Sequence, residues 1–443
     1  MRIVSIAIIV ALMHAARSFD PQTGAGAGAG GTVLAAGFLL LTAYLVGTLF
    51  KDLRLPKLTG YLITGVVVGP AVADLVTHRM LVDLRVFNGV AISLIALTAG
   101  SELEFGTLRP LLRVIRWITG VAVVGTIALL TATIYFVQPL LPFARDLDQV
   151  QWLAVSLTLA VAMAAQSPAV VVALRKETEA EGPLSRTVLG VVVLSEVVIL
   201  MLFAVVSALS QAAISGTADI ADTVLGIGWE IFGSIAVGLL VGVLVAAFLR
   251  YAHAGGALFV VLIGFLAAEV GQRIHLDPLI VALVTGIFIC NATRYGHRLH
   301  ESVEGGSLPV YVTFFSVAGA TLHLDALAHL GLPVLLFVLV RAAGLLGGAR
   351  IGARAAGAPE TIRRYAGFGL VPQAGLALAL ALLFARTFPE FGADASALIF
   401  GVVTINELVA PVLYRFVLVR SGEAGRTEPA QTIGVNPAAP ALE

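Results

Sequence analysis

Charged residues are scarce in this sequence. Asp, Glu, Lys and Arg make up 12% of its 443 residues, whereas 59% are hydrophobic; a typical soluble domain has about twice that charge. Such a composition cannot cover a globular surface with polar groups, so it excludes a soluble protein. The 27 basic and 27 acidic residues cancel, and nothing in their distribution indicates a nucleic-acid partner. The chain is therefore predicted to reside in a lipid bilayer.

Cysteine and metal-binding motifs are nearly absent as well. Cys290 is the one cysteine, which excludes an intrachain disulfide and a thiolate metal cluster. The eight histidines form no HExxH or His–Cys spacing, and no nucleophile–base pairing is recognisable. We therefore expect no cofactor, no resident metal and no enzymatic activity.

Long apolar segments are what the sequence has instead. A helix of about 20 residues crosses the ~30 Å hydrocarbon core of a bilayer, and backbone polar groups within that core must pair internally. We therefore predict an all-α polytopic membrane protein with thirteen spanning helices. Their segments are 32–50, 57–75, 86–103, 114–137, 150–174, 184–210, 222–249, 255–271, 276–292, 307–323, 330–350, 364–386 and 393–419.

The two ends of the chain differ from these segments. Residues 1–18 combine a basic start with a short apolar run, which fits either a signal peptide or an extra N-terminal helix. Residues 19–31 are rich in Gly and Ala and are predicted to form a flexible linker. Residues 420–443 are polar and contain proline, so a disordered cytoplasmic tail is predicted.

Basic residues beside the predicted helices fall mostly on one side of the membrane. Nineteen Lys and Arg residues lie on the side of the C-terminus. The other side has six, namely Arg17, Arg79, Arg85, Arg145, Arg273 and Arg386. Because Lys and Arg are retained in the cytoplasm, the C-terminus is predicted to be cytoplasmic. The predicted location is the inner (plasma) membrane of a bacterium.

The two halves of the sequence resemble each other. LPKLTGYLITG at 55–65 matches LDPLIVALVTG at 276–286, and AGSELEFGTL at 99–108 matches AGATLHLDAL at 318–327. The offsets, 221 and 219 residues, are nearly equal in consecutive predicted helices. Apolar composition alone does not produce such agreement, so we infer an internal repeat.

The number of helices in each half determines their relative orientation. Six helices are predicted in 32–210, one connecting helix in 222–249, and six more in 255–419. Because a single helix connects the two six-helix repeats, the repeats lie in opposite orientations in the membrane. Inverted repeats with a site near the bilayer midplane are an architecture of secondary transporters.

Proline interrupts two predicted helices at matching places. Gln166, Ser167 and Pro168 lie within 150–174, and Pro372 and Gln373 lie within 364–386. Proline removes a backbone donor and opens the helix, and open backbone at membrane depth must be buried or line a cavity. Paired breaks present half-helix ends to an ion, whereas the alternative is a simple kink. We predict an ion site at these breaks.

Glu196 lies near the middle of the segment 184–210, next to Ser195. A carboxylate at membrane depth costs a few kcal/mol unless it is neutralised, which makes it a functional candidate. Either a proton or a cation can neutralise it. The alternative is a structural ion pair with Arg341, for which Glu407 at the equivalent depth is the expected partner. Glu196 is then the predicted ion carrier.

Three further glutamates lie nearer to the ends of predicted helices. They are Glu102, Glu230 and Glu269. Side chains at that depth reach the polar interface, so we expect them to be structural or to attract ions toward the site.

Several stretches together resemble the monovalent cation:proton antiporter superfamily, including sodium/hydrogen exchangers and glutathione-gated-potassium-efflux-like proteins. They are LPKLTGYLITGVVVGP (55–70), ALTAGSELEF (96–105), AQSPAVVVALRK (165–176), LDPLIVALVTGIFICN (276–291) and GLVPQAGLALALAL (369–382). The resemblance implies crossed discontinuous helices and a homodimer. It also implies a dimerisation part, residues 32–105 and 255–325, against which a core part, residues 112–210 and 330–419, moves vertically.

The sequence departs from the pattern of this family at the expected site. Relatives usually have Thr-Asp-Pro in the first broken helix and Asn-Asp, Asp-Asp or Gln-Asp in the next helix. Here Gln166-Ser167-Pro168 and Ser195-Glu196 occupy these places, and Gln373 stands where electroneutral relatives have arginine. One midplane carboxylate implies one proton per cation.

The predicted function is exchange of Na⁺ or K⁺ for protons, with Glu196 as carrier. Ser195, Gln166, Ser167 and Gln373 are the expected supporting ligands. Two alternatives stay open because the usual aspartates are missing: a proton-coupled transporter of another small solute, and a non-transporting membrane sensor or scaffold. A channel is disfavoured, because nothing in the sequence indicates a permanently open, charged pore.

Overall fold

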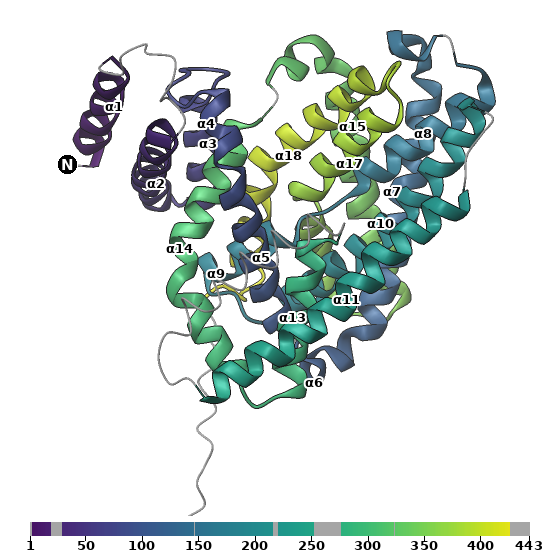
Figure 1. Cartoon of the computed structure of the whole chain (residues 1–443). Helices are drawn as coiled ribbons and strands as arrows, with labels where there is room; N and C mark the ends of the chain where they lie inside the picture. The colour runs from purple at the N-terminus through teal and green to yellow at the C-terminus, as the bar shows by residue number, and fades with distance from the viewer. Residues whose placement is uncertain are drawn as a thin grey trace, which may run out of the picture.

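The computed structural model describes residues 2–18, 29–145, 147–215, 220–251, 276–322 and 324–425. The predicted helix 255–271, with Glu269, lies outside the described residues, as do most of the linker 19–31 and the tail beyond residue 425. Every regular element in the described ranges is a helix (Figure 1). The predicted all-α fold class is therefore confirmed.

The helices follow the predicted apolar segments closely. They are α1 (Arg2–Ser18), α2 (Ala29–Asp52), α3 (Lys57–Val68), α4 (His78–Asp83), α5 (Arg85–Ser101), α6 (Phe105–Leu108), η1 (Arg109–Leu111), α7 (Leu112–Phe136), η2 (Gln138–Leu140), η3 (Pro142–Ala144), α8 (Gln149–Ala164), α9 (Pro168–Thr178), α10 (Pro183–Ser215), α11 (Ile220–Tyr251), α13 (Pro278–Ala292), α14 (Gly296–Ala320), α15 (Leu324–Ala355), α16 (Glu360–Tyr365), η4 (Ala366–Leu370), α17 (Gly375–Thr387) and α18 (Gly392–Arg420).

The described helices confirm a polytopic membrane protein but not the predicted number of spans. Seven are long and apolar enough to cross a bilayer, or eight if the bent pair Glu360–Leu370 and Gly375–Thr387 forms one span. Apolar helices such as Lys57–Val68 and Pro278–Ala292 are shorter than that criterion. Large apolar side chains on the helix exteriors are exposed, for example Val124 at 62% and Phe232 at 69%, as a lipid-facing surface requires.

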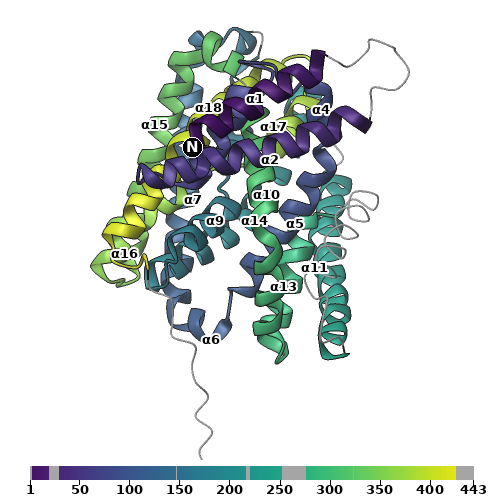
Figure 2. The same ribbon diagram turned by 90° about the vertical axis from the view of Figure 1, so that its left-hand side faces the viewer.

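The internal repeat appears as two matching helix interfaces. α3 packs against α14, and α5 packs against α13. Figure 2 shows α5, α13 and α14 next to one another. A Cβ atom on Gly65 would overlap the carbonyl oxygen of Ser316, and one on its repeat counterpart Gly286 would collide with the carbonyl oxygen of Leu97. Glycine lets the helix backbones approach this closely. The same small-residue contact is thus used once in each repeat.

A second group of helices packs around a separate apolar cluster. α7, α8, α10, α15, α17 and α18 contribute to it, with Trp152, Phe337 and Phe384 fully buried. In Figure 1 these helices lie on the right, and α2, α3 and α14 lie on the left. One half of each predicted discontinuous helix, α8 and α17, belongs to this second group, whereas α9 and η4 pack into another apolar cluster through Val170 and Leu370.

Both predicted helix breaks form, and they cross. α8 ends at Ala164 and α9 begins at Pro168, while η4 ends at Leu370 and α17 begins at Gly375. The two non-helical stretches touch, because the backbone N–H of Ser167 donates to the carbonyl oxygen of Pro372 at 3.0 Å. The crossed discontinuous helices of the predicted fold are confirmed.

The chain ends are more ordered than the composition suggests. α1 packs against α2, with Met13 buried beside Phe38 and Leu39; whether this helix is a signal peptide stays a prediction. The prediction of disorder from residue 420 is wrong for Ser421–Gly425, where Glu423 is 4% exposed. The reason is that its carboxylate accepts hydrogen bonds at the N-terminus of α10, which compensates the burial of charge.

Candidate functional site

Glu196 on α10 lines a cavity of about 370 Å³. Its side chain is 4% exposed, and the non-helical residues Gln166 and Ser167 line the same cavity. The rest of the wall is largely apolar, with Ile92, Ile95, Leu283 and Phe314 among its residues. Three of the five predicted ion-binding residues therefore meet at one cavity.

Gln166 lies in this cavity wall with unsatisfied polar atoms. The side chain is 1% exposed, and neither its amide oxygen nor its amide nitrogen has a hydrogen-bond partner. Buried polar groups are nearly always paired, so an unpaired amide calls for an explanation such as an ion or a water. Ser167 is different, because its hydroxyl oxygen accepts from the backbone N–H of Val170 at 3.3 Å and begins α9.

Ser195 and Gln373 do not line the cavity. Ser195 is fully buried, and its hydroxyl has no hydrogen-bond partner. The Gln373 amide instead holds the crossing of the breaks: its Nε2 donates to the carbonyl oxygen of Met163 at 2.8 Å, and its Oε1 accepts from Asn406 at 2.7 Å. The structure thus brings Gln373 close to the broken helices, but in a bracing position.

Arg341 on α15 is fully buried and joins the two breaks. Its Nε and Nη2 donate to the carbonyl oxygens of Met163 and Ala165 at the first break, and its Nη1 donates to Val371 at the second, each at 2.7 Å. Helix ends leave carbonyl groups without intrahelical partners and carry partial negative charge. The fork of guanidinium donors matches that arrangement.

The predicted ion pair between Arg341 and Glu407 does not form. The Arg341 guanidinium donates three hydrogen bonds to backbone carbonyl oxygens, and the ion pairs found among the described residues do not include one with Glu407. Glu407 on α18 is 2% exposed, and its Oε2 has no hydrogen-bond partner. The prediction failed because unwinding at the breaks supplies the acceptors that a carboxylate was expected to supply.

Two further acidic residues line the cavity. Glu230 lies on α11, and Asp277 precedes α13. The sequence predicts a structural or ion-attracting role for Glu230 and no role for Asp277. The sequence does contain a signal for it: Asp277-Pro278 before an apolar run is typical of a helix start. In the first repeat Pro56 occupies the place of Asp277, so the acid is a departure from the repeat.

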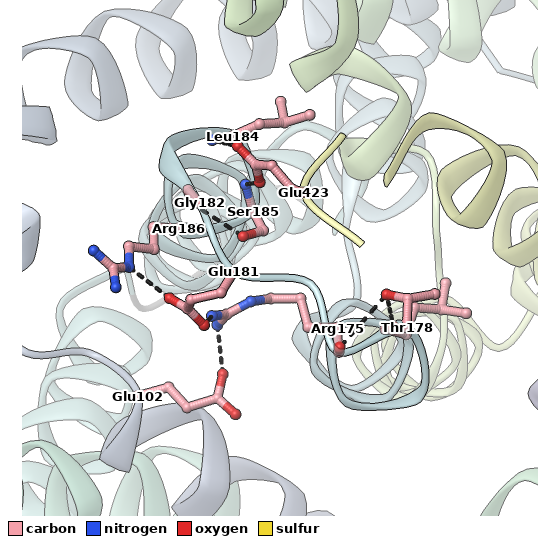
Figure 3. Close-up of polar contacts among 10 residues, drawn as sticks. Glu102, Arg175, Thr178, Glu181, Gly182, Leu184, Ser185, Arg186 and Glu423 are labelled. Carbon is pink, nitrogen blue, oxygen red and sulfur yellow. Dashed lines mark hydrogen bonds and ion pairs between the residues drawn. The ribbon is translucent and has the colours of Figure 1, made fainter. Parts of the chain in front are cut away.

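Ion pairs close the side of the molecule that carries the C-terminus. Figure 3 shows Arg175 of α9 pointing at Glu102, the residue that ends α5, and at Glu181. Arg186 donates to Glu181 at 2.7 Å. Glu423 accepts from the backbone N–H groups of Leu184 and Ser185 at 2.7 and 2.8 Å. The end of α9 is therefore tied to α5, α10 and the C-terminal segment.

A second contact on this side joins α9 to α3. The Glu177 carboxylate accepts from the backbone N–H groups of Lys57 and Leu58 at 2.6 and 3.4 Å. The cavity involves the opposite end of α13. Asp277, at the start of α13, lines the cavity. Asn291, near the end of α13, forms hydrogen bonds with Leu103 and Phe105, which lie beside Glu102 in the sequence. The cavity thus includes the start of α13, the end of that helix that lies away from Glu102.

Comparison with known proteins agrees with this geometry. The family model described as sodium/hydrogen exchanger, transmembrane, matches residues 38–420. Two solved structures of the sodium proton antiporter MjNhaP1 from Methanocaldococcus jannaschii are similar in fold, each at 15% identity over 88% of this chain. The structure at pH 8 has a TM-score of 0.65 over 96% of its chain, and the electron-microscopy structure 0.67 over 97%.

A sequence search of curated proteins finds no match. The match of the family model nevertheless covers most of the sequence, including both helix breaks and Glu196. This chain therefore belongs to the sodium/hydrogen exchanger family, whose members are cation:proton antiporters rather than enzymes.

Proposed function

We propose that this protein exchanges a monovalent cation, Na⁺ or K⁺, for protons by alternating access, and that Glu196 carries either ion. The observation behind the proposal is the position of Glu196, buried at the wall of a cavity beside the crossed helix breaks. A carboxylate at membrane depth is costly unless neutralised. A bound proton and a bound cation both neutralise it, and they exclude each other.

The neighbours of Glu196 have different roles in this proposal. Gln166, whose amide is buried and unpaired at the cavity wall, and Ser167 supply oxygen ligands to the cation. Ser195 lies beside the carrier on α10 and supports it. Gln373 and Arg341 brace the two breaks through the carbonyl oxygens that they contact, so the site keeps its shape when the core part moves.

The fixed charge of Arg341 bears on the transport stoichiometry. It is bound to helix-end carbonyl oxygens, so it has no need to exchange its proton during transport. Among the described residues, Glu196 is then the one carboxylate of the core part that lines the cavity, and one proton leaves for each cation that binds. We therefore propose electroneutral exchange.

The contacts between α9 and the helices α3 and α5 define a closed side. Arg175–Glu102 and Glu177–Lys57 link the core part to the dimerisation part. Transport would break these links as the core part moves and would close the cavity near Asp277. We further propose a homodimer in a bacterial inner membrane. The C-terminus is placed in the cytoplasm because the basic residues concentrate on that side.

A second candidate function follows from the size of the cavity. Its volume of about 370 Å³ and largely apolar wall are within the range of pockets for small organic ligands. A proton-coupled transporter of such a solute would use Glu196 in the same way but would not require an alkali cation. Dependence of proton flux on the alkali cation separates the two candidates.

Proton flux in proteoliposomes tests the proposal. Liposomes with an interior pH dye and an imposed pH gradient would receive Na⁺, K⁺ and Li⁺ in turn, with choline as the control cation. We expect the wild type to dissipate the gradient with at least one alkali cation, without dependence on membrane potential. Failure with all three would refute cation exchange, and flux driven by membrane potential would refute electroneutrality.

A further inference from the structure

The cavity beside Glu196 has a second acidic wall that the carrier mechanism leaves unused. Asp277 and Glu230 line the cavity together with Glu196 and Gln166. Asp277 lies at the start of α13 and Glu230 lies on α11. Glu196 and Gln166 belong to the core part. Acidic side chains from the core part, from α11 and from the start of α13 thus line the same cavity.

Local hydrogen bonds fix the position of Asp277. Its Oδ1 accepts from the backbone N–H groups of Leu279 and Ile280 at 2.7 and 3.3 Å, so it caps α13. Its own backbone N–H donates to the hydroxyl oxygen of Ser234 at 2.9 Å, and that hydroxyl donates to the carbonyl oxygen of Glu230. The cap uses Oδ1 and keeps the side chain at the cavity wall.

Like charges across the cavity favour a cation between them. Asp277 and Glu196 line the same cavity, and two ionised carboxylates that share a site repel each other. The position of Asp277 at a helix N-terminus stabilises its negative charge. A cation placed between the two carboxylates relieves the repulsion without neutralising either acid by a proton.

An independent feature of the same cavity also indicates a ligand. Gln166 is 1% exposed, and both of its amide atoms lack hydrogen-bond partners, although it lines the same cavity as Glu196 and Asp277. An amide oxygen is a suitable ligand for an alkali cation, as carbonyl oxygens are in ion-selective channels. A desolvated, unpaired amide beside two carboxylates is the donor set of a cation site.

We propose that Asp277, assisted by Glu230, forms a second cation subsite opposite Glu196, which loads the transported cation from the membrane side away from the C-terminus. This inference rests on the proposed function. Asp277 does not move with the core part, so the subsite is complete only in the conformation described here. Moving the core part separates Glu196 and its cation from Asp277.

Substitution of Asp277 by Asn removes the charge and retains the cap, because both residues cap helices well. Asp277→Ser is a second cap-retaining variant. The matched control is Asp148→Asn: Asp148 caps α8 through Val150 and Gln151 in the same way but does not line the cavity. A mere loss of helix capping would affect both positions alike.

The experiment measures Na⁺, K⁺ and Li⁺ binding calorimetrically on the full chain in lipid nanodiscs, together with the apparent KM of proton flux. We expect Asp277→Asn and Asp277→Ser to weaken affinity and raise KM at least about tenfold, since a carboxylate a few ångströms from a cation contributes more than 1.4 kcal/mol at protein dielectric. Asp148→Asn should match the wild type, and Glu230→Gln should fall between them.

Unchanged affinity and KM in both Asp277 variants would overturn the subsite, while loss of flux in Glu196→Gln would still support the proposed function. A wild type that shows neither cation binding nor cation-dependent flux would overturn both. Cation binding that depends on Asp277, without any proton flux, would support the subsite and refute the exchange.

Discussion

The backbone N–H of Ser167 donates to the carbonyl oxygen of Pro372 at 3.0 Å, across 205 residues of sequence. This hydrogen bond joins the two helix breaks directly, one from each repeat. Arg341 and Gln373 surround the contact and bind the carbonyl oxygens that the breaks expose. The cavity with Glu196 lies beside this crossing, so the stability of the crossing determines the geometry of the site.

Replacement of Arg341 by Met should destabilise the protein strongly. The variant removes the donor to the carbonyl oxygens of Met163, Ala165 and Val371. Met163 keeps Gln373 as a donor, and leaving the other two buried oxygens unsatisfied costs roughly 1–3 kcal/mol each. We expect a loss of about 3 kcal/mol or more, measured as a lower melting temperature in detergent. Arg350→Met on the same helix, where the side chain is exposed, is the control. An unchanged melting temperature for Arg341→Met would contradict the bracing role.

Neutralising Glu102 should open the side that carries the C-terminus. Glu102 and Arg175 are 13% and 6% exposed, and a buried pair that loses one partner is strongly weakened. The reporter is a cysteine in place of Ala169, in a Cys290→Ser background. Glu102→Gln should accelerate maleimide labelling of this cysteine from the side of the C-terminus about fivefold or more. A loss of about 1–2 kcal/mol from the ion pair shifts the equilibrium between closed and open states by that order.

The matched control for this experiment is Glu104→Gln. Glu104 lies two residues away and is exposed, and it forms none of the ion pairs found with Arg175. Equal labelling rates in Glu102→Gln and Glu104→Gln would mean that the Arg175–Glu102 pair does not hold this side closed.

Gly100→Ala should disturb the interface between α5 and α13. A Cβ atom there would collide with the carbonyl oxygen of Leu283, a backbone atom that cannot rotate away. Overpacking of this kind costs about 1–3 kcal/mol and should lower the melting temperature. The matched variant is Gly120→Ala on α7, which meets nothing within 4 Å and should gain up to about 1 kcal/mol from helix propensity. Similar effects of both changes would refute the tight packing.

The sequence contained most of the local information about the fold. Apolar segments predicted the helices, and Pro168 and Pro372 predicted where two of them break, because both signals act within one or two turns. The inverted repeat was readable from the offsets of its motifs. The count of thirteen spans stays a prediction, since the segment 255–271 lies outside the described residues and several described helices are shorter than the criterion for a full crossing.

The parts of the site that depend on long-range contacts were less predictable. Glu196 and Gln166 were found from their depth and their helix break. The partners of Arg341 were not, because unwinding at residues far away in sequence provides its acceptors. Asp277 had a readable capping signal, but its position at the cavity depends on how α13 packs beside α5 and α11. Glu423 belongs to a polar tail by its sequence neighbours, and its contact with α10 depends on the fold.

The central claim, that Glu196 carries the exchanged ion, is tested most directly by comparing two isosteric substitutions in the proteoliposome assay. Glu196 and Glu407 are both buried on long helices, but Glu196 lines the cavity and Glu407 is not among its lining residues. Glu196→Gln should abolish cation-dependent proton flux, whereas Glu407→Gln should retain it. Flux that survives in Glu196→Gln and disappears in Glu407→Gln would contradict the account and move the carrier to α18.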